Sequence, residues 1–124
     1  MLYLVFAHTG EAPLRLGPMP SFKVQGALII DHKGEIVARH NGHRWQLGER
    51  SFYRVDCEGP LRVKLDAASL TTRGPFDHLS LVNGTAYASR DVFAHYHSQS
   101  DSWTLQDGEH RIVSFVVTSV ETQI

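Results

Sequence analysis

The stretch from Phe22 to Leu47 constrains the fold most. Apolar and polar residues alternate along it, and two turn signals divide it into three segments. Asp31-His32-Lys33-Gly34 places aspartate and glycine where a type I turn favours them. Asn41-Gly42 joins two residues that tolerate positive φ, which is a strong hairpin signal. The stretch therefore predicts three antiparallel strands that share a hydrophobic face, over residues 22–30, 35–40 and 43–47.

Short alternating runs continue along the rest of the chain. Asn83-Gly84 predicts another hairpin, whereas Gly59-Pro60 and Gly74-Pro75 are interpreted as breaks between strands. Residues 9–21 predict a loop, and residues 66–73 predict one or two turns of helix at most. The pattern indicates a single all-β domain over residues 1–124, with nine or ten short, strongly bent antiparallel strands in a barrel-like or sandwich arrangement.

Composition limits the class of protein. The 124 residues are 42% hydrophobic and 20% charged, which is ordinary for a globular domain. Cys57 is the one cysteine of the sequence, so an intrachain disulfide is excluded and a reducing compartment is favoured. No apolar run reaches the length of a membrane span. We therefore expect a cytoplasmic protein without a membrane partner.

Charge is unevenly distributed along the chain. Residues 23–64 hold eight Lys or Arg against five Asp or Glu, residues 65–124 hold three against seven, and the formal net charge is −1. The small total argues against a general polyanion binder. The asymmetry favours one anionic ligand on one face, or self-association of subunits with opposed faces, most simply as a homodimer.

The pair His95-x-His97 places two imidazoles on one side of a strand. Together with Asp101 and Gly108 it resembles the first metal-binding motif of the cupins, a family whose later histidine motif has no counterpart after Gly108. The resemblance would imply a small histidine-dependent metalloenzyme. The pattern favours a half-exposed strand with outward polar residues, and hence no metal and no cofactor.

Catalytic signatures are absent from the sequence. There is no Gly-x-Ser-x-Gly elbow and no glycine-rich phosphate loop, and Cys57 lies among apolar residues in the middle of a strand. We therefore expect a protein that is not an enzyme. Its aromatic residues suit a hydrophobic core, with a stacking surface for sugars or bases as the alternative.

Two segments resemble the motifs of Sm-like small β-barrel proteins. Gly26 to Asp31 is similar to the first motif, one residue shorter, and Leu81 to Tyr87 is similar to the second, with Asn83 where that family carries arginine. The resemblance implies assembly through edge strands, with RNA contacts near Asp31 and the Asn83-Gly84 turn.

These observations favour a binding or assembly module that contacts nucleic acid or another anionic ligand. A metalloenzyme using His95 and His97 and a β-sandwich that binds a carbohydrate or another small ligand are the alternatives. His40, His43 and Arg44 could hold a phosphate or carboxylate, or could be solvated hairpin residues. The candidate ligand-binding residues are Asp31, His32, Lys33, His40, His43, Arg44, Asn83 and Gly84.

Overall fold

The structure is a computed structural model that describes residues 1–7, 12–65, 72–106 and 111–120. All regular structure in these residues is β-strand, which confirms the all-β prediction. No helix of a length and apolarity that could cross a membrane occurs among the described residues.

Fourteen strands occur in the described residues, more than the nine or ten expected. The first seven are β1 (Leu2–Ala7), β2 (Leu14–Met19), β3 (Ser21–Gln25), β4 (Leu28–Asp31), β5 (Ile36–His40), β6 (Trp45–Leu47) and β7 (Arg50–Phe52). The others are β8 (Arg54–Leu65), β9 (Thr72–Val82), β10 (Thr85–Ala88), β11 (Asp91–His97), β12 (Ser102–Leu105), β13 (Arg111–Ile112) and β14 (Ser114–Ser119).

All strands belong to one antiparallel sheet that divides at β8. The hydrogen-bonded order is β13-β12-β11-β10-β9-β8-β14-β3-β4-β5-β6-β7, and β1 adds the β1–β2 hairpin to β8. The first part of β8 pairs with β1, and its last part pairs with β14. Because β13 and β7 end the order without pairing with each other, the sheet is open and the closed barrel we considered is wrong.

The change of partner along β8 occurs at a bulge. The pairing of β8 with β9 shifts register between Glu58 and Leu61 and again between Leu61 and Val63. Gly59 and Gly74 lie at this bulge, and a Cβ on either would collide with the backbone of the opposite strand. The sequence predicted breaks between strands at Gly59-Pro60 and Gly74-Pro75, but both pairs lie inside long strands, β8 and β9. The strands continue through them because glycine permits a bend with close backbone approach.

Three other boundaries differ from the prediction. The strand expected over residues 22–30 is the β3–β4 hairpin, which turns at Gly26 with φ of 54°. The loop expected over 9–21 contains β2, an edge strand, where proline is tolerated. Of the helix expected over 66–73, residues 66–71 lie outside the described residues, and Thr72 and Arg73 begin β9.

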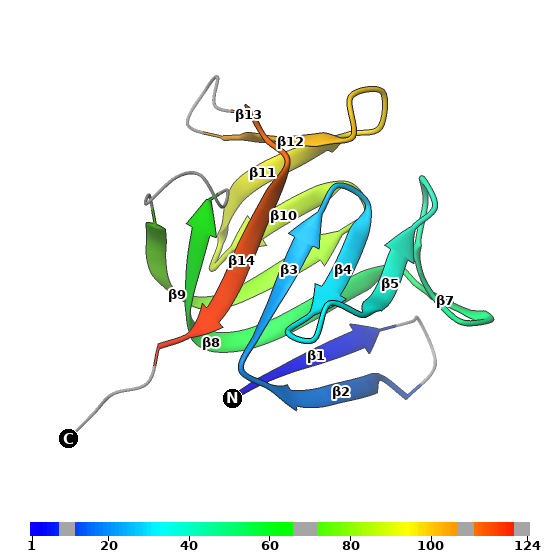
Figure 1. The fold of residues 1–124 in the computed structure, drawn as a ribbon, viewed down its shortest axis with the longest axis horizontal. Helices are drawn as coiled ribbons and strands as arrows, with labels where there is room; N and C mark the ends of the chain where they lie inside the picture. The colour runs from blue at the N-terminus through cyan, green and yellow to red at the C-terminus, as the bar shows by residue number, and fades with distance from the viewer. Residues whose placement is uncertain (8–11, 66–71, 107–110, 121–124) are drawn as a thin grey trace.

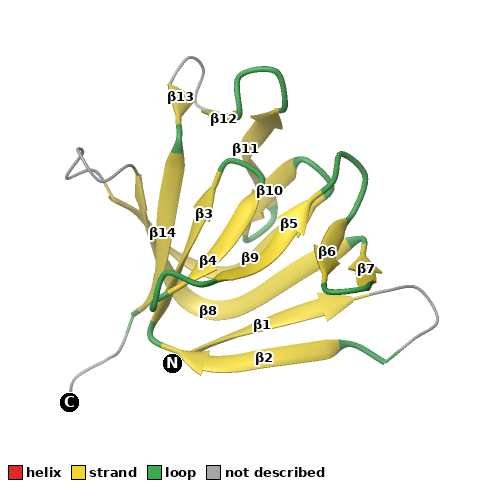
Figure 2. Ribbon diagram, turned by 45° about the vertical axis from the view of Figure 1, so that its right-hand side comes forward, coloured by secondary structure: helices red, strands yellow, loops and turns green. Residues whose placement is uncertain are grey.

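Two arms of the sheet, β9–β13 and β3–β7 with β14, fold over a shared hydrophobic core (Figures 1 and 2). Aromatic contacts connect the arms: the Phe115 ring of β14 lies 5.8 Å from Phe93 and 5.6 Å from Trp103, measured between centroids. The series continues through Tyr96 to His40 and ends at Trp45. Aromatic pairs of this kind contribute about 0.5–1.5 kcal/mol each beyond their buried area.

We expect Gly59→Ala to lower the free energy of unfolding by about 1–3 kcal/mol, because its methyl group would press against the Phe76 and Asp77 carbonyl oxygens. Gly84→Ala is the matched control. A Cβ at Gly84 would meet the Tyr96 Cβ at an ordinary 3.8 Å, so we expect a change within about 0.5 kcal/mol. Urea denaturation measures both values, and equal effects would contradict the role given to the bulge.

Candidate functional site

Four connections between strands gather at one end of the molecule, which we call the hairpin end. They are the turns at residues 26–27, 41–44 and 83–84 and the connection at 98–101 (Figure 1). Backbone hydrogen bonds hold them in place: the His40 N–H donates to the Ala27 carbonyl over 2.7 Å, and the Tyr96 N–H donates to the Gly84 carbonyl over 2.7 Å. Residues far apart in sequence are therefore fixed next to one another.

The hairpin end encloses a narrow space of about 130 Å³ between side chains, half of them aromatic, with no room for a water molecule. It is lined by Gly26, Ala27, His40, Trp45, Asn83, Gly84, Tyr96 and Trp103. Trp103 helps to form one wall, because its indole N–H donates to the Gly26 carbonyl over 2.9 Å. Gly26 adopts a positive φ of 54°, which L side chains rarely take, and a Cβ there would collide with the Asp101 carboxylate.

Two buried nitrogen atoms at this space lack hydrogen-bond partners among the described residues: Nε2 of His40 and Nε1 of Trp45. The two rings are in edge contact, with centroids 5.0 Å apart. Nδ1 of His40 accepts the Gly42 N–H over 3.3 Å, so the proton of the neutral imidazole lies on Nε2. The site therefore carries two buried N–H donors, each of which costs about 1–3 kcal/mol when unpaired.

Burial determines the ionisation of the groups around the space. It lowers the pKa of His40 below the ordinary 6.5, and the nearby His43 lowers this pKa further. Burial also raises the pKa of Tyr96 to about 12, and so does the hydrogen bond from its hydroxyl to Oδ1 of Asp101, which spans 2.6 Å. At neutral pH the space is therefore lined by a neutral imidazole and a protonated phenol.

The turn that follows His40 presents the exposed residues His43 and Arg44. Oδ1 of Asn41 accepts their backbone N–H groups over 2.9 and 2.8 Å, and the Asn41 N–H donates to the Arg44 carbonyl. This arrangement is the local side-chain-to-backbone bonding by which asparagine stabilises turns. It confirms the predicted hairpin, with positive φ at Gly42, and places a cationic side chain in the turn beside His40.

The structure divides the predicted ligand-binding residues into two groups. His40, Asn83 and Gly84 line the aromatic space, and His43 and Arg44 occupy the turn beside it. Asn83-Gly84 is the tight turn of the β9–β10 hairpin, as predicted, and its positive φ of 54° is at Asn83.

Asp31, His32 and Lys33 form the other group, at the opposite end of β5. The Asp31 carboxylate accepts the Lys33 and Glu35 backbone N–H groups, each over 2.9 Å. The bond from Glu35 contributes most to lowering the pKa of this carboxyl. Asp31 therefore stabilises a turn, and the structure does not bring it near Asn83-Gly84.

The histidine pair of β11 lies outside the hairpin-end space. His95 and His97 are exposed, and Nδ1 of His95 lies 3.4 Å from the Thr85 hydroxyl. Asp101 instead accepts the Tyr96 hydroxyl, and Gly108 lies outside the described residues. Within the described residues, no group of three or more His, Cys, Asp or Glu side chains is arranged to hold a metal ion.

Cys57 is buried in β8, as its apolar neighbours predicted. Burial raises the pKa of its thiol to about 12, and the charge of Glu58 contributes in the same direction. A thiol in this state is a poor nucleophile at neutral pH.

Sequence reasoning missed Gly26, Trp45, Tyr96 and Trp103 as site residues. The three aromatics were assigned to packing or to a general stacking surface, because nothing in the sequence shows that β6, β11 and β12 meet. Gly26 offered a usable signal, since an isolated glycine inside an apolar run marks a bend or a close approach.

No protein-family model, curated protein or solved structure matches the chain.

We expect stability to depend on pH through His40. Because its folded-state pKa is lowered, the unfolded chain binds more protons, and the free energy of unfolding rises with pH up to about 6.5 and then levels off. Urea denaturation at a series of pH values from 5 to 7.5 gives the slope of the free energy of unfolding against pH. This slope should be shallower for His40→Gln than for the wild type. His32→Gln, which removes an exposed histidine elsewhere, should keep the wild-type slope. Equal slopes for all three proteins would contradict this assignment.

Proposed function

We propose that this protein is a non-enzymatic binding module whose hairpin end takes the carboxylate group of a small ligand. The supporting observation is the pair of buried N–H donors without partners, Nε2 of His40 and Nε1 of Trp45. A ligand oxygen that accepted from both would remove the cost of leaving them unpaired. No residue arrangement at this site supplies an activated nucleophile.

Charge favours a carboxylate over a neutral carbonyl. The exposed turn after His40 carries the Arg44 cation, which opposes the negative charge of the Asp101 carboxylate bound to Tyr96. An anionic group would be attracted to the Arg44 guanidinium and would form stronger hydrogen bonds with the two N–H donors.

The size of the space limits which part of a ligand enters. The space has no room for a water molecule as it stands, so a small planar head group enters only if the surrounding side chains move apart, and the rest of the ligand would lie over the exposed 41–44 turn. Bases of single-stranded nucleic acid need exposed aromatic faces to stack on. The tryptophans here are 0% and 1% exposed, so their rings offer the bases of nucleic acid no face to stack on.

The two indole N–H groups provide a direct test with an internal control. We expect sodium benzoate to shift the ¹H–¹⁵N resonance of the Trp45 indole, whose N–H has no partner, while the Trp103 resonance stays in place. Trp45→Phe and Trp103→Phe assign the two signals. Benzamide, a neutral molecule of the same shape, should bind about tenfold more weakly than benzoate, because hydrogen bonds to charged groups are stronger.

His40→Gln should weaken benzoate binding, and Lys33→Gln, which removes an exposed cation at the opposite end of β5, should leave it unchanged. A Trp45 resonance that ignores benzoate would overturn the carboxylate proposal. Displacement of the exposed turn resonances by a single-stranded RNA alone would support the nucleic-acid reading instead.

We also propose that the chain self-associates through its open sheet. Among the described residues, β2, β7 and β13 each pair with one strand, and β2, with six residues, is the longest of these edges. Unpaired edge groups promote association with a second chain. The basic residues of 23–64 and the acidic residues of 65–124 would set orientation and encounter rate more than affinity.

Light scattering at micromolar concentration tests this proposal. We expect a dimer mass that persists in high salt, because edge pairing and apolar burial resist screening better than exposed ion pairs do. A monomer mass at every salt concentration would contradict it.

A further inference from the structure

The outward face of the sheet carries a row of side chains that the hairpin end does not use. Register aligns Arg15, Val5, Asp56, Ser80 and Tyr87 across β2, β1, β8, β9 and β10. Their neighbours in sequence, such as Val55, Leu79 and Ala86, are buried on the inner face, so alternation turns this row outward. We call this surface the outer face.

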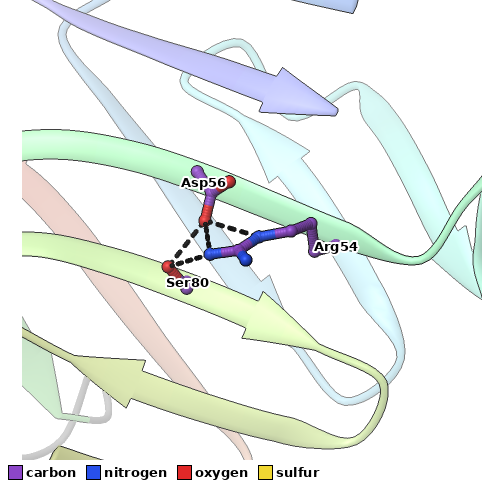
Figure 3. Close-up of polar contacts among 3 residues, drawn as sticks. All are labelled: Arg54, Asp56 and Ser80. Carbon is purple, nitrogen blue, oxygen red and sulfur yellow. Dashed lines mark hydrogen bonds and ion pairs between the residues drawn. The ribbon is translucent and has the colours of Figure 1, made fainter. Parts of the chain in front are cut away.

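At the centre of the outer face, three polar side chains form a closed network (Figure 3). One carboxylate oxygen of Asp56, Oδ1, accepts hydrogen bonds from Nε and Nη2 of Arg54 over 3.2 and 2.8 Å and from the Ser80 hydroxyl over 2.6 Å. Nη2 also donates to the Ser80 oxygen over 3.3 Å. Ser80 is 4% exposed, so the network is anchored in the sheet.

The network fixes the guanidinium and the carboxylate while leaving both accessible. The Arg54 side chain is 36% exposed and the Asp56 side chain 25% exposed. No described residue donates a hydrogen bond to the second carboxylate oxygen, Oδ2 of Asp56. The pair therefore presents a hydrogen-bond donor and an acceptor side by side, with no net charge between them.

The outer face is hollowed on both sides of β8. A hollow of about 320 Å³ is lined by Arg54, His78, Ser80, Val82, Tyr87 and Ser89. A second hollow, of about 390 Å³, is lined by Met1, Tyr3, Val5, Arg15, Glu58 and Gly59. The Arg15 guanidinium lies 3.9 Å from the centre of the Tyr3 ring, which holds that ring at the border of the second hollow.

We propose that the outer face binds a neutral carbohydrate, with one sugar ring in each hollow and the chain of rings crossing β8. A hydroxyl group both donates and accepts, so neighbouring hydroxyls match the Asp56 carboxylate and the Arg54 guanidinium together. Tyr87 and Val82 supply apolar surface for the carbon face of a ring. Because the Arg54–Asp56 pair carries no net charge, it suits a neutral ligand, which separates this ligand class from the carboxylates of the hairpin end.

The test is a ¹H–¹⁵N titration of the full chain with maltotriose, cellotriose and tri-N-acetylchitotriose, with inorganic phosphate as the anionic probe. We expect at least one trisaccharide to shift the backbone resonances of His78, Ser80 and Tyr87, and its monosaccharide to bind more weakly because it fills one hollow. Phosphate should leave these resonances in place. No shift with any of the saccharides would overturn the proposal.

Asp56→Asn keeps the side-chain shape but replaces an acceptor with an N–H donor, so saccharide affinity should fall about 10- to 100-fold. Glu35→Gln is the matched control, because it removes one acidic charge in the β4–β5 turn and should keep wild-type affinity. Thermal unfolding checks that each variant folds. If Asp56→Asn does not fold, saccharide affinity is measured with Tyr87→Ala in its place. Wild-type saccharide affinity in whichever of the two variants is folded and measured would overturn the proposal.

His40→Gln distinguishes the two sites, since it should weaken benzoate binding at the hairpin end and leave saccharide binding intact. Loss of saccharide binding in His40→Gln would contradict a separate site on the outer face.

Discussion

Close backbone approach at the bulge between β8 and β9 is the constraint on which the rest of the architecture depends. Gly59 and Gly74 allow the two strands to bend together where any side chain would collide with the opposite backbone. Before the bend β8 pairs with β1, and after it with β14. One strand thus serves both the β1–β2 hairpin and the arm that carries β3–β7, and the two arms can close over a shared core.

The sequence predicted local structure well wherever a turn is encoded by neighbouring residues. Asp31, Asn41 and Asn83 each lie in a hairpin connection at the predicted place. The side chains of Asp31 and Asn41 accept backbone N–H groups of their own turns, and Asn83 adopts a positive φ, which asparagine tolerates. Prediction failed where a glycine has a long-range role. Gly59 and Gly74 look like strand breaks in sequence, and their need for glycine arises from a partner strand that local patterns do not reveal.

The candidate sites show the same division between local and long-range information. His40, Asn83 and Gly84 were identified from their hairpins, and the structure brings them together. Trp45 and Trp103 complete that space only because distant strands pack against each other. The same holds for the outer face. Alternation in β8 predicts that Arg54 and Asp56 lie on one side of the strand, but only the β8–β9 register places Ser80 beside them.

The position of β14 between β3 and β8 has a consequence for how the chain folds as it is made. Phe22 of β3 pairs with Val117, which lies near the other end of the described sequence, and Leu61 of β8 pairs with Ser119. Until the ribosome has released this segment, the β3–β7 arm has no strand to join it to β8. Until β14 pairs, the apolar face of this arm, with Phe22 and Val24, stays exposed to solvent or bound by a chaperone. Contacts this distant in sequence form slowly.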